Sequence, residues 1–319
     1  MSILSHSVEH KIYLTISYDN DFSRQIHLSR IKINYMTFAF QSAEEIIEGD
    51  IHFSELKKEY LKLFNYNRDI VEGLYYASTI QQGLLPQKRH FERLFNEYFI
   101  LYKPQQIIGG DFYWVAQKDE KIIFACADCT GHGVAGAMLS TLGISYLNYV
   151  VFGKNYDNLG RMLEEIDKKW IETFSKFSDI MENNDWMEIM LCSFDINTRE
   201  LCFAGAKGSL LMVNNETHES FHGNRYPIGG WQIEKHRTFD EHKIKLKPRT
   251  CIYLGSDGFK HQLGGKKGKK FSEKRLNDHI ADIYDIPINL QSNLLKMSLE
   301  EWQGSLEQTD DICLMGIKF

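Results

Sequence analysis

The sequence predicts an α+β fold, and two observations lead to this prediction. Short apolar runs of strand length follow one another after residue 88, and long helical patterns lie between groups of these runs instead of alternating with each of them. This order favours a sandwich of strands over a parallel, doubly wound sheet. The predicted strands are 97–102, 111–117, 121–127, 188–195, 199–205, 208–214, 250–255 and 311–319, and the predicted helices are 134–151, 158–182, 272–282 and 288–303.

The chain before this region divides into two parts. Residues 1–50 form a small, β-leaning segment, because 11–17 and 25–40 are rich in β-branched and aromatic residues. Residues 51–86 form a long helix that Pro86 ends. Its seam consists of two interleaved series that repeat every seven residues over 53–84, namely Leu56, Leu63, Ile70, Ala77, Leu84 and Phe53, Tyr60, Asn67, Leu74, Gln81.

The heptad pattern favours a self-associating helix that makes the protein a homodimer. The polar residues Asn67 and Gln81 would then fix the register of the helix pair at some loss of stability. The alternative is a long helix that packs on its own domain.

Composition limits the function classes. An apolar fraction of 43% with 25% charged residues is ordinary for a globular protein, and the net charge of −6 gives no reason to expect nucleic acid as a partner. We find no apolar stretch of membrane-spanning length and no secretory leader, and the six cysteines lie mostly in apolar runs, so a reduced, cytoplasmic protein is expected. The basic run 266–270 is expected to be a solvated loop or, because it follows Asp257 closely, a docking loop.

Four acidic motifs carry the strongest chemical signal. In each, an aspartate stands at the edge of an apolar run and next to a glycine or a second acid. Packed carboxylates repel each other and lose hydration, so a shared site needs cations or protons. Oxygen ligands favour Mg²⁺ or Mn²⁺. The sequence therefore predicts a binuclear metal site at strand ends, built from 109–111 (GGD), 127–133 (ADCTGHG), 255–258 (GSDG) and 309–311 (TDD).

The motif around Asp128 is the most specific of the four. It combines an acid, a hydroxyl, two glycines and His132 in six residues, and a helix is predicted to begin directly after it. A helix N-terminus offers backbone N–H groups to a phosphate or a metal-bound hydroxide. His132 is a candidate general acid; the alternative is an imidazole that only caps the loop. The glycines expected to allow the close turns of these motifs are Gly110, Gly131, Gly133 and Gly258.

The order of these motifs and their neighbours resembles a known family. GGDFYW, ADCTGHGVAGAM, DWMEIML, LCFAGA, YPIGG, YLGSDGF and QTDDICLMGI occur in this order between about residues 85 and 319. This pattern is similar to the bacterial metal-dependent (PPM-type) serine/threonine phosphatases of the sporulation stage II E type, a group that includes regulators of sigma factors. The resemblance implies a phosphatase domain at 87–319, with a central antiparallel β-sandwich flanked by helices and two Mn²⁺ or Mg²⁺ ions at one end of it.

The resemblance also implies the ligands. Asp111, Asp128 and the backbone carbonyl of Cys129 would hold the first ion, and Asp128 would bridge to a second ion held by Asp257 and Asp310. Asp311 would be an outer or alternative ligand. Water activated by the two ions would attack phosphorus without a phospho-enzyme.

Three features bear on how far the family pattern carries over. His132 stands two positions beyond the acid histidine of the eukaryotic branch, so its transfer as general acid is weak. Ala206 replaces a histidine present in part of the family. The stretch 226–230 (YPIGG) is expected to be a turn that returns the chain to the sheet, with a loop beside the substrate groove as the alternative.

The function implied is dephosphorylation of a phosphoserine or phosphothreonine in a small regulatory protein of the anti-anti-sigma (STAS) type. Residues 1–50 would be a regulatory segment, and the helix of 51–86 would dimerise the protein and pass a signal to the site. One alternative is a catalytically idle module that only binds the phosphorylated partner. A nucleotide cyclase, suggested by 109–111 alone, is opposed by the aspartates far downstream and by the lack of a P-loop.

Overall fold

The computed structural model describes residues 3–8, 11–16, 50–175, 184–215, 217–234 and 236–319, with side chains described from residue 56. The chain forms two compact units, Met1–Asn65 and Tyr66–Phe319. In the first unit, β1 (Ile3–Val8) pairs antiparallel with β2 (Lys11–Ile16), which confirms the strand predicted at 11–17. The β-leaning stretch predicted at 25–40 lies outside the described residues.

A single long helix, α2 (Asp50–Leu84), confirms the helix predicted at 51–86, and it ends two residues before Pro86. Several apolar residues of the predicted seam are exposed in the chain, including Leu63 at 62% and Ile70 at 44%. Self-association through this face stays a prediction. The role predicted for Gln81 is wrong, because its side chain is buried within its own unit and is therefore not available to a helix pair.

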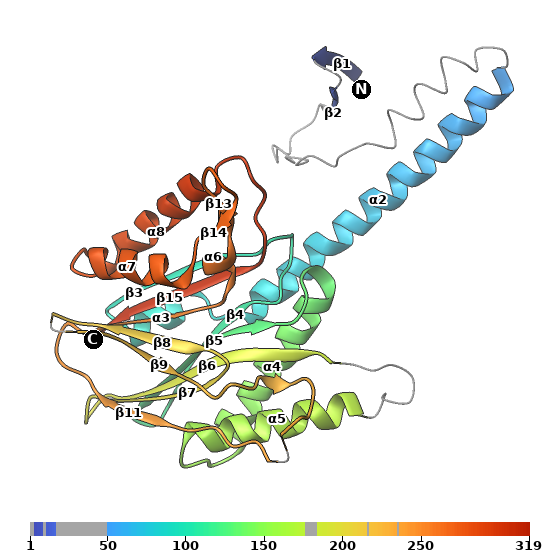
Figure 1. Ribbon diagram of the computed structural model, residues 1–319. Helices are drawn as coiled ribbons and strands as arrows, with labels where there is room; N and C mark the ends of the chain where they lie inside the picture. Colours follow the sequence, from blue (N-terminus) through green and yellow to red (C-terminus); the bar gives the residue numbers. More distant parts are fainter. Residues whose placement is uncertain (1–2, 9–10, 17–49, 176–183, 216, 235) are drawn as a thin grey trace. The chain divides into compact units, whose positions relative to one another are not determined.

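The second unit contains two antiparallel sheets that face each other (Figure 1), which confirms the predicted α+β sandwich. The first sheet has the order β11-β7-β6-β5-β4, with β10 beside β6, and the second has the order β3-β15-β12-β8-β9. The strands of the first sheet are β4 (Phe112–Lys118), β5 (Lys121–Cys129), β6 (Trp186–Asp195), β7 (Glu200–Ala206), β10 (Ile228–Gly229) and β11 (His242–Lys245). Those of the second are β3 (Glu97–Lys103), β8 (Ser209–Val213), β9 (His218–His222), β12 (Cys251–Gly255) and β15 (Ile312–Lys318).

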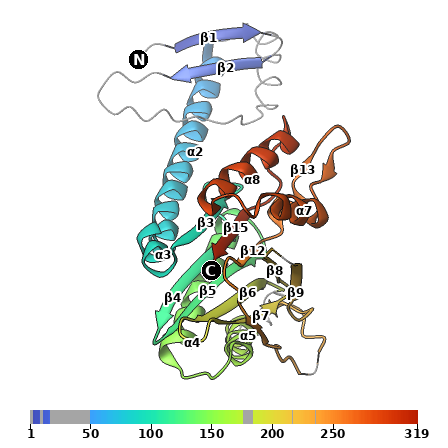
Figure 2. The ribbon, with the colours of Figure 1, turned by 90° about the vertical axis from the view of Figure 1, so that its left-hand side faces the viewer.

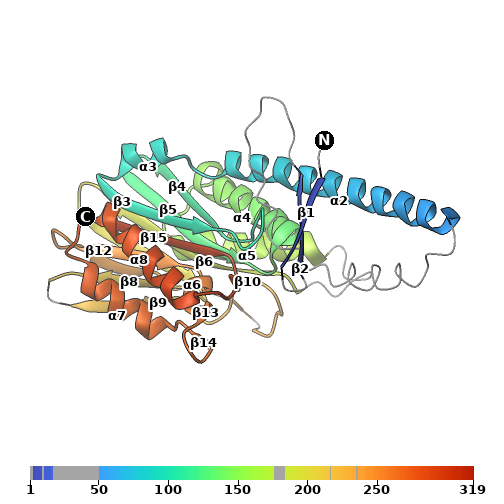
Figure 3. The same cartoon turned by 90° about the horizontal axis from the view of Figure 1, so that it is seen from above.

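Helices cover the outer faces of both sheets, and Figures 2 and 3 show them on opposite sides of the sandwich. Residues of α4 (Gly133–Gly153) and α5 (Leu159–Ser175) pack on the first sheet. Residues of α7 (Glu273–Ile283) and α8 (Ile288–Gln303) pack on the second. The described part of α5 confirms the helix predicted at 158–182 as far as residue 175, and the rest of that prediction lies outside the described residues.

The core has three layers that follow from strand periodicity. On β5, Phe124 and Cys126 point between the sheets, where they meet residues of β12 and β15. Ala125 and Ala127 on the same strand point to the helices α4 and α5. Because β5 is buried on both faces, its sequence reads as a continuous apolar run rather than an alternating one.

Several elements were not predicted because their sequences lack an apolar pattern. The strands β9 and β11 are mostly exposed, and their residues are largely polar. The short elements α3 (Lys88–Leu94), α6 (Gly258–His261), β13 (Leu263–Gly264) and β14 (Lys269–Lys270) are also absent from the prediction. The hairpin β13–β14 contains the basic run 266–270.

Among the described helices, α4 is the one whose length and composition would allow it to cross a membrane. Half of its most apolar window is buried inside the fold. A buried core helix passes the same test, so this finding is weak evidence for a span.

Candidate metal centre

The four acidic motifs lie at strand ends of both sheets. Asp111 directly precedes β4, and Asp128 is near the end of the adjacent strand β5. Asp257 follows β12, while Asp310 and Asp311 precede the adjacent strand β15. Strand pairing thus joins the motifs within each sheet, and the packing of the two sheets brings motifs about two hundred residues apart together, as the hydrogen bond from Gly110 N–H to Asp311 Oδ2 shows.

Asp111 is the most buried acid of this group, at 1% exposure. Burial raises the pKa of its carboxyl well above the usual value, and the negative charge of Asp128 raises that pKa further. Ser256 Oγ donates a hydrogen bond to Asp111 Oδ2 at 2.5 Å, which opposes the shift, and accepts one from Cys313 N–H at 2.9 Å. Ser256 thus links the ends of β12 and β15 to the first sheet. The sequence does not indicate this role of Ser256, because the role requires the packing of the two sheets.

Asp128 lies among other negative charges. Burial raises the pKa of its carboxyl well above the usual value, and Asp257, Glu188 and Asp310 raise it further, while a hydrogen bond with Asp111 opposes the shift. Because the neighbouring carboxylates add further negative charge, the cluster needs positive charge from cations or protons.

Asp310 is half-buried within the same cluster. Burial is the largest cause of its raised pKa, and the backbone N–H of Asp311, which donates to Asp310 Oδ1 at 2.8 Å, opposes the shift. The charge of Asp257 raises the pKa of Asp310 as well, so the structure brings Asp128, Asp257 and Asp310 into mutual electrostatic contact.

Asp311 holds the loop in front of Asp111. Its Oδ1 accepts a hydrogen bond from Gln105 N–H at 2.7 Å, and its Oδ2 accepts one from Gly110 N–H at 2.6 Å. Both carboxylate oxygens are thus used by backbone groups, and the side chain is 3% exposed. Of the two roles implied for Asp311, this geometry favours the outer, loop-holding one.

The predicted glycines lie where the chain segments come closest. A Cβ on Gly110 would lie 2.7 Å from the carbonyl oxygen of Cys129, so only glycine lets the 109–111 loop rest against that carbonyl. A Cβ on Gly258 would lie 1.8 Å from the carbonyl oxygen of Asp311. Gly131 and Gly133 have positive φ values of 82° and 64°.

His132 occupies the position before α4, and its side chain caps no backbone group of that helix. The ring is exposed, and its Nδ1 lies 2.8 Å from Nε2 of Gln106. His132 therefore does not cap the helix, whereas its hydrogen bond to Gln106 agrees with the alternative of an imidazole that caps the loop. Its role as a general acid stays a prediction; the ring is close enough to Asp310 to lower the pKa of that carboxyl slightly.

Gln81, near the end of α2, contacts the same loop from outside the sandwich. Its Nε2 donates to the carbonyl oxygen of Gly109 at 2.7 Å and to Ser140 Oγ on α4 at 2.9 Å. The side chain is 6% exposed. A polar residue inside an apolar heptad seam was the available signal, but the sequence does not show that its partner is the loop of Gly109.

The donor set fits hard divalent cations. The carboxylates raise one another's pKa, and Oδ1 of Asp257 is buried without a hydrogen-bond partner among the described residues. Its Oδ2 lies 3.1 Å from Nδ1 of His261. In the part of the chain that the structure describes, no three histidine, cysteine, aspartate or glutamate side chains form a complete metal-binding group.

The six cysteines form no disulfide, and Cys126 and Cys129 are buried in the core.

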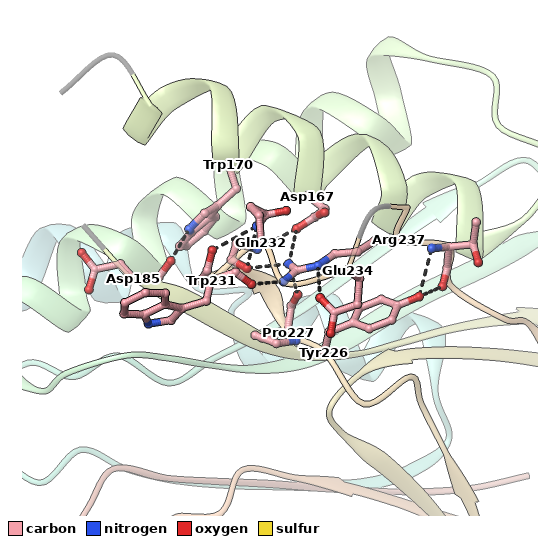
Figure 4. Close-up of polar contacts among 12 residues, drawn as sticks. Asp167, Trp170, Asp185, Tyr226, Pro227, Trp231, Gln232, Glu234 and Arg237 are labelled. Carbon is pink, nitrogen blue, oxygen red and sulfur yellow. Dashed lines mark hydrogen bonds and ion pairs between the residues drawn. The ribbon is translucent and has the colours of Figure 1, made fainter. Parts of the chain in front are cut away.

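The 226–230 stretch returns the chain to the sheet, as predicted. β10 pairs with the start of β6, and Arg237 lies behind it with its side chain 5% exposed (Figure 4). Arg237 Nη1 donates to the carbonyl oxygen of Gly229 at 2.6 Å and lies 3.4 Å from Asp167 Oδ1. The same carboxylate oxygen also accepts from Gly229 N–H at 2.7 Å.

The 226–230 stretch also connects to the segment around Thr130 through Gly230, whose N–H donates to the carbonyl oxygen of Asp185 at 3.1 Å. Asp185 in turn accepts from Thr130 Oγ1 at 3.0 Å.

Comparison with known proteins assigns the family. Residues 118–319 match the family model described as Stage II sporulation protein E (SpoIIE). The chain belongs to this family. Its fold is similar to the SiaA-PP2C domain of Pseudomonas aeruginosa, with a TM-score of 0.72 and 30% identity over 80% of this chain and 98% of that one.

Two further solved structures show the same fold at lower identity. One contains the PP2C phosphatase domain and a fragment of the regulatory domain of SpoIIE from Bacillus subtilis, with a TM-score of 0.58 and 13% identity over 70% of this chain and 63% of that one. The other contains the RsbU and RsbW domains of Rv1364c from Mycobacterium tuberculosis, with a TM-score of 0.54 and 17% identity over 70% of this chain and 59% of that one. None of the curated proteins matches the chain.

Membership of the SpoIIE family places the chain among the metal-dependent PP2C-type serine/threonine phosphatases. It confirms the resemblance found in the sequence motifs and the predicted sandwich.

Proposed function

We propose that this chain is an active phosphatase that hydrolyses phosphoserine or phosphothreonine in a protein, using two Mn²⁺ or Mg²⁺ ions. The observation that carries the proposal is the cluster of four acids, Asp111, Asp128, Asp257 and Asp310, which lacks compensating positive charge. Within the described residues, a buried oxygen of Asp257 also has no hydrogen-bond partner. A fold that only needed stability would not gather these acids, because burying like charges is costly.

The ligand roles follow the motif pattern. Asp111, Asp128 and the carbonyl of Cys129 would hold one ion, and Asp128, Asp257 and Asp310 the other. When bound, the ions would lower the pKa of water and neutralise charge on the phosphoryl oxygens.

Other residues of the chain would position these ligands. Ser256 fixes the orientation of Asp111 through its hydrogen bond, and Asp311 holds the preceding loop. His132, exposed and beside Gln106, is the candidate donor of a proton to the departing hydroxyl.

The substrate protein is proposed to be a small STAS-type regulator, on the basis of family membership. The chain would act in the cytoplasm as a homodimer joined through the helix of 53–84. Its regulation would use Gln81, because a shift of α2 would change the hydrogen bond to Gly109 and with it the place of Asp111. In this proposal, α2 has two positions, and a change between them would couple the N-terminal segment to the metal site.

The test is hydrolysis of p-nitrophenyl phosphate with and without Mn²⁺. Wild type should turn over only with the ion, and Asp128→Ala should lower the rate by about 10³-fold or more, because the bridging ligand supplies several kcal/mol of transition-state stabilisation. Asp285→Ala is the control, since that carboxylate is 63% exposed and pairs only with Arg249 at 3.6 Å among the described residues.

Equal rates for wild type and Asp128→Ala would refute the proposed site. No turnover by wild type at any Mn²⁺ concentration, together with retained binding of a phosphorylated STAS protein, would favour the idle binding module instead.

A further inference from the structure

A hollow of about 400 Å³ opens beside the acidic cluster, and lysines from three separate elements line it. Asp257 and Glu188 contribute to its wall, so it adjoins the proposed metal site. The lysines are Lys207, between β7 and β8, Lys260 on α6, and Lys270 on β14. Cations from three elements at one hollow are not explained by metal binding, because they would repel the ions.

Lys207 is held firmly next to the acidic cluster. Its Nζ lies 2.8 Å from Glu188 Oε1 and 4.0 Å above the ring centre of Trp186. Glu188 stands opposite Asp128 in the β5–β6 register, and its charge raises the pKa of Asp128. Lys207 is thus one side chain away from the proposed ligands, and its charge is already used by Glu188.

Lys260 and Lys270 differ from Lys207 in having no ion pair within the described residues. The two elements that carry them are tied together, since the N–H of Ser272 donates to the carbonyl oxygen of Lys260 at 2.8 Å. The hairpin β13–β14 adds Lys266, Lys267 and Lys269, which are all exposed. Three carboxylates, Glu188, Asp257 and Glu273, line the same hollow as the three lysines. Glu188 pairs with Lys207 and Asp257 is a proposed metal ligand, so Glu273 is the carboxylate of the wall that is left to offset Lys260 and Lys270.

We propose that this lysine-lined hollow, defined by Lys207, Lys260 and Lys270, binds acidic side chains that flank the phosphorylated residue of the substrate. The proposal rests on the proposed phosphatase function for the identity of the neighbouring site. It assigns the basic run 266–270 to substrate docking instead of mere solvation. Lys260 and Lys270 are the specificity residues, because their charges face the hollow without a partner among the described residues.

Charge complementarity of this kind determines which peptide binds and depends on ionic strength. The chain has a net charge of −6, so an acidic partner is repelled by the surface as a whole and gains only where cations gather. Each exposed ion pair is expected to change affinity by about two- to fivefold, and salt weakens the effect.

The experiment measures, by anisotropy in the presence of Mn²⁺, the binding of fluorescent peptides in which a phosphonate analogue that cannot be hydrolysed replaces phosphoserine. Two peptides of equal length carry either Asp and Glu or Asn and Gln around this analogue. Wild type should bind the acidic peptide about tenfold more tightly than the neutral one, and the preference should shrink at about 0.5 M salt. The double variant Lys260→Ala, Lys270→Ala should bind both peptides about equally.

Two controls keep the result interpretable. Lys260→Arg with Lys270→Arg keeps the charges and should keep the preference, which separates charge from folding. Lys296→Ala removes an exposed lysine of α8 outside the hollow and should change nothing.

The proposal is overturned if wild type binds both peptides equally, or if the alanine double variant keeps the preference. Turnover of p-nitrophenyl phosphate is measured in parallel on every variant. Since this small ester has no flanking residues, a lost preference with unchanged turnover supports the docking role. Absent turnover with an intact, lysine-dependent preference would instead count against the proposed catalysis alone.

Discussion

In the described part of the second unit, the buried Asp167 and the acidic cluster around Asp111 have their negative charge compensated in opposite ways. Asp167 on α5 is buried beside Arg237 and accepts a hydrogen bond from Gly229 N–H, so the chain supplies its own compensation. Asp111 and Asp128 are buried mainly among other acids. The pairing of Asp167 with Arg237 therefore stabilises a loop, whereas the cluster around Asp111 and Asp128 needs bound cations to compensate its negative charge.

Removing the internal compensation should have the largest effect on stability. Arg237→Met leaves Asp167 buried without its cation and frees the carbonyls of Gly229 and Pro227, so the free energy of unfolding should fall by about 3–5 kcal/mol. Chemical denaturation of metal-free protein measures it. Arg225→Met, which changes an exposed arginine of the same loop, should alter stability by about 0.5 kcal/mol or less. Equal losses of unfolding free energy in the two arginine variants would show that Arg237 does not compensate the charge of Asp167.

The same variant should show a specific pH dependence. In the wild type, burial raises the pKa of Asp167 above its usual value despite the neighbouring Arg237. An acid whose pKa is raised by folding binds its proton more tightly in the folded state, so its contribution to stability falls as pH rises from the unfolded pKa through the folded one. Arg237→Met raises the folded pKa further.

The stability deficit of Arg237→Met relative to wild type should therefore be smaller near pH 4 than at pH 7, with the loss from the freed carbonyls remaining at both. Unfolding midpoints over this range measure it. A deficit that is constant with pH would show that lost packing, and not the charge of Asp167, causes the destabilisation.

External charge should stabilise the acidic cluster. Mn²⁺ at about a hundredfold excess over its dissociation constant should add about 2.7 kcal/mol per site, and EDTA should remove this gain. Asp257→Asn should lose much of it, because it removes a charged oxygen that has no partner within the described residues. Thermal unfolding with and without the ion measures both. Asp167→Asn should keep the Mn²⁺ response, and its loss there would break the distinction between the two sites.

The contact of α2 with the acidic loop should have a medium effect. Gln81→Ala leaves the carbonyl of Gly109 without its donor, which should cost about 1–3 kcal/mol and weaken the binding of Mn²⁺. Calorimetric titration measures the affinity. Gln82→Ala is the matched control, because Gln82 lies on the exposed side of the helix. Its side chain donates one hydrogen bond in the described structure, to Ser78 Oγ at 3.2 Å. An unchanged affinity for Mn²⁺ in Gln81→Ala would show that α2 does not influence the metal site.

The smallest change in the stability of the chain is expected for Leu63→Glu combined with Ile70→Glu. Both side chains are exposed, so the folded chain should lose about 0.5 kcal/mol or less. If the helix dimerises the protein, the variant should be a monomer by light scattering and have an altered turnover rate. An unchanged mass and rate would refute the dimerising seam.

Apolar periodicity predicted the elements with buried faces. The strands β3 to β8, β12 and β15 and the four long helices of the second unit agree with the predictions to within a few residues in their described parts. The polar edge strands β9 and β11 were missed, since a strand exposed on its surface needs no apolar residues. Gln81 was assigned to the wrong partner for a related reason, because a heptad pattern identifies a face without identifying what it contacts.

The sequence by itself determined the acidic motifs, their order and the family. It did so because a carboxylate beside a glycine at the end of an apolar run has a local chemical meaning that does not depend on distant residues. Only the tertiary structure decided that Ser256 donates to Asp111, that Asp311 holds the loop of Gly110, and that Lys260 and Lys270 face the same hollow as Asp257. The physical reason is that hydrogen bonds and charge clusters act over a few ångströms, and strand pairing together with the packing of the two sheets decides which distant residues come that close.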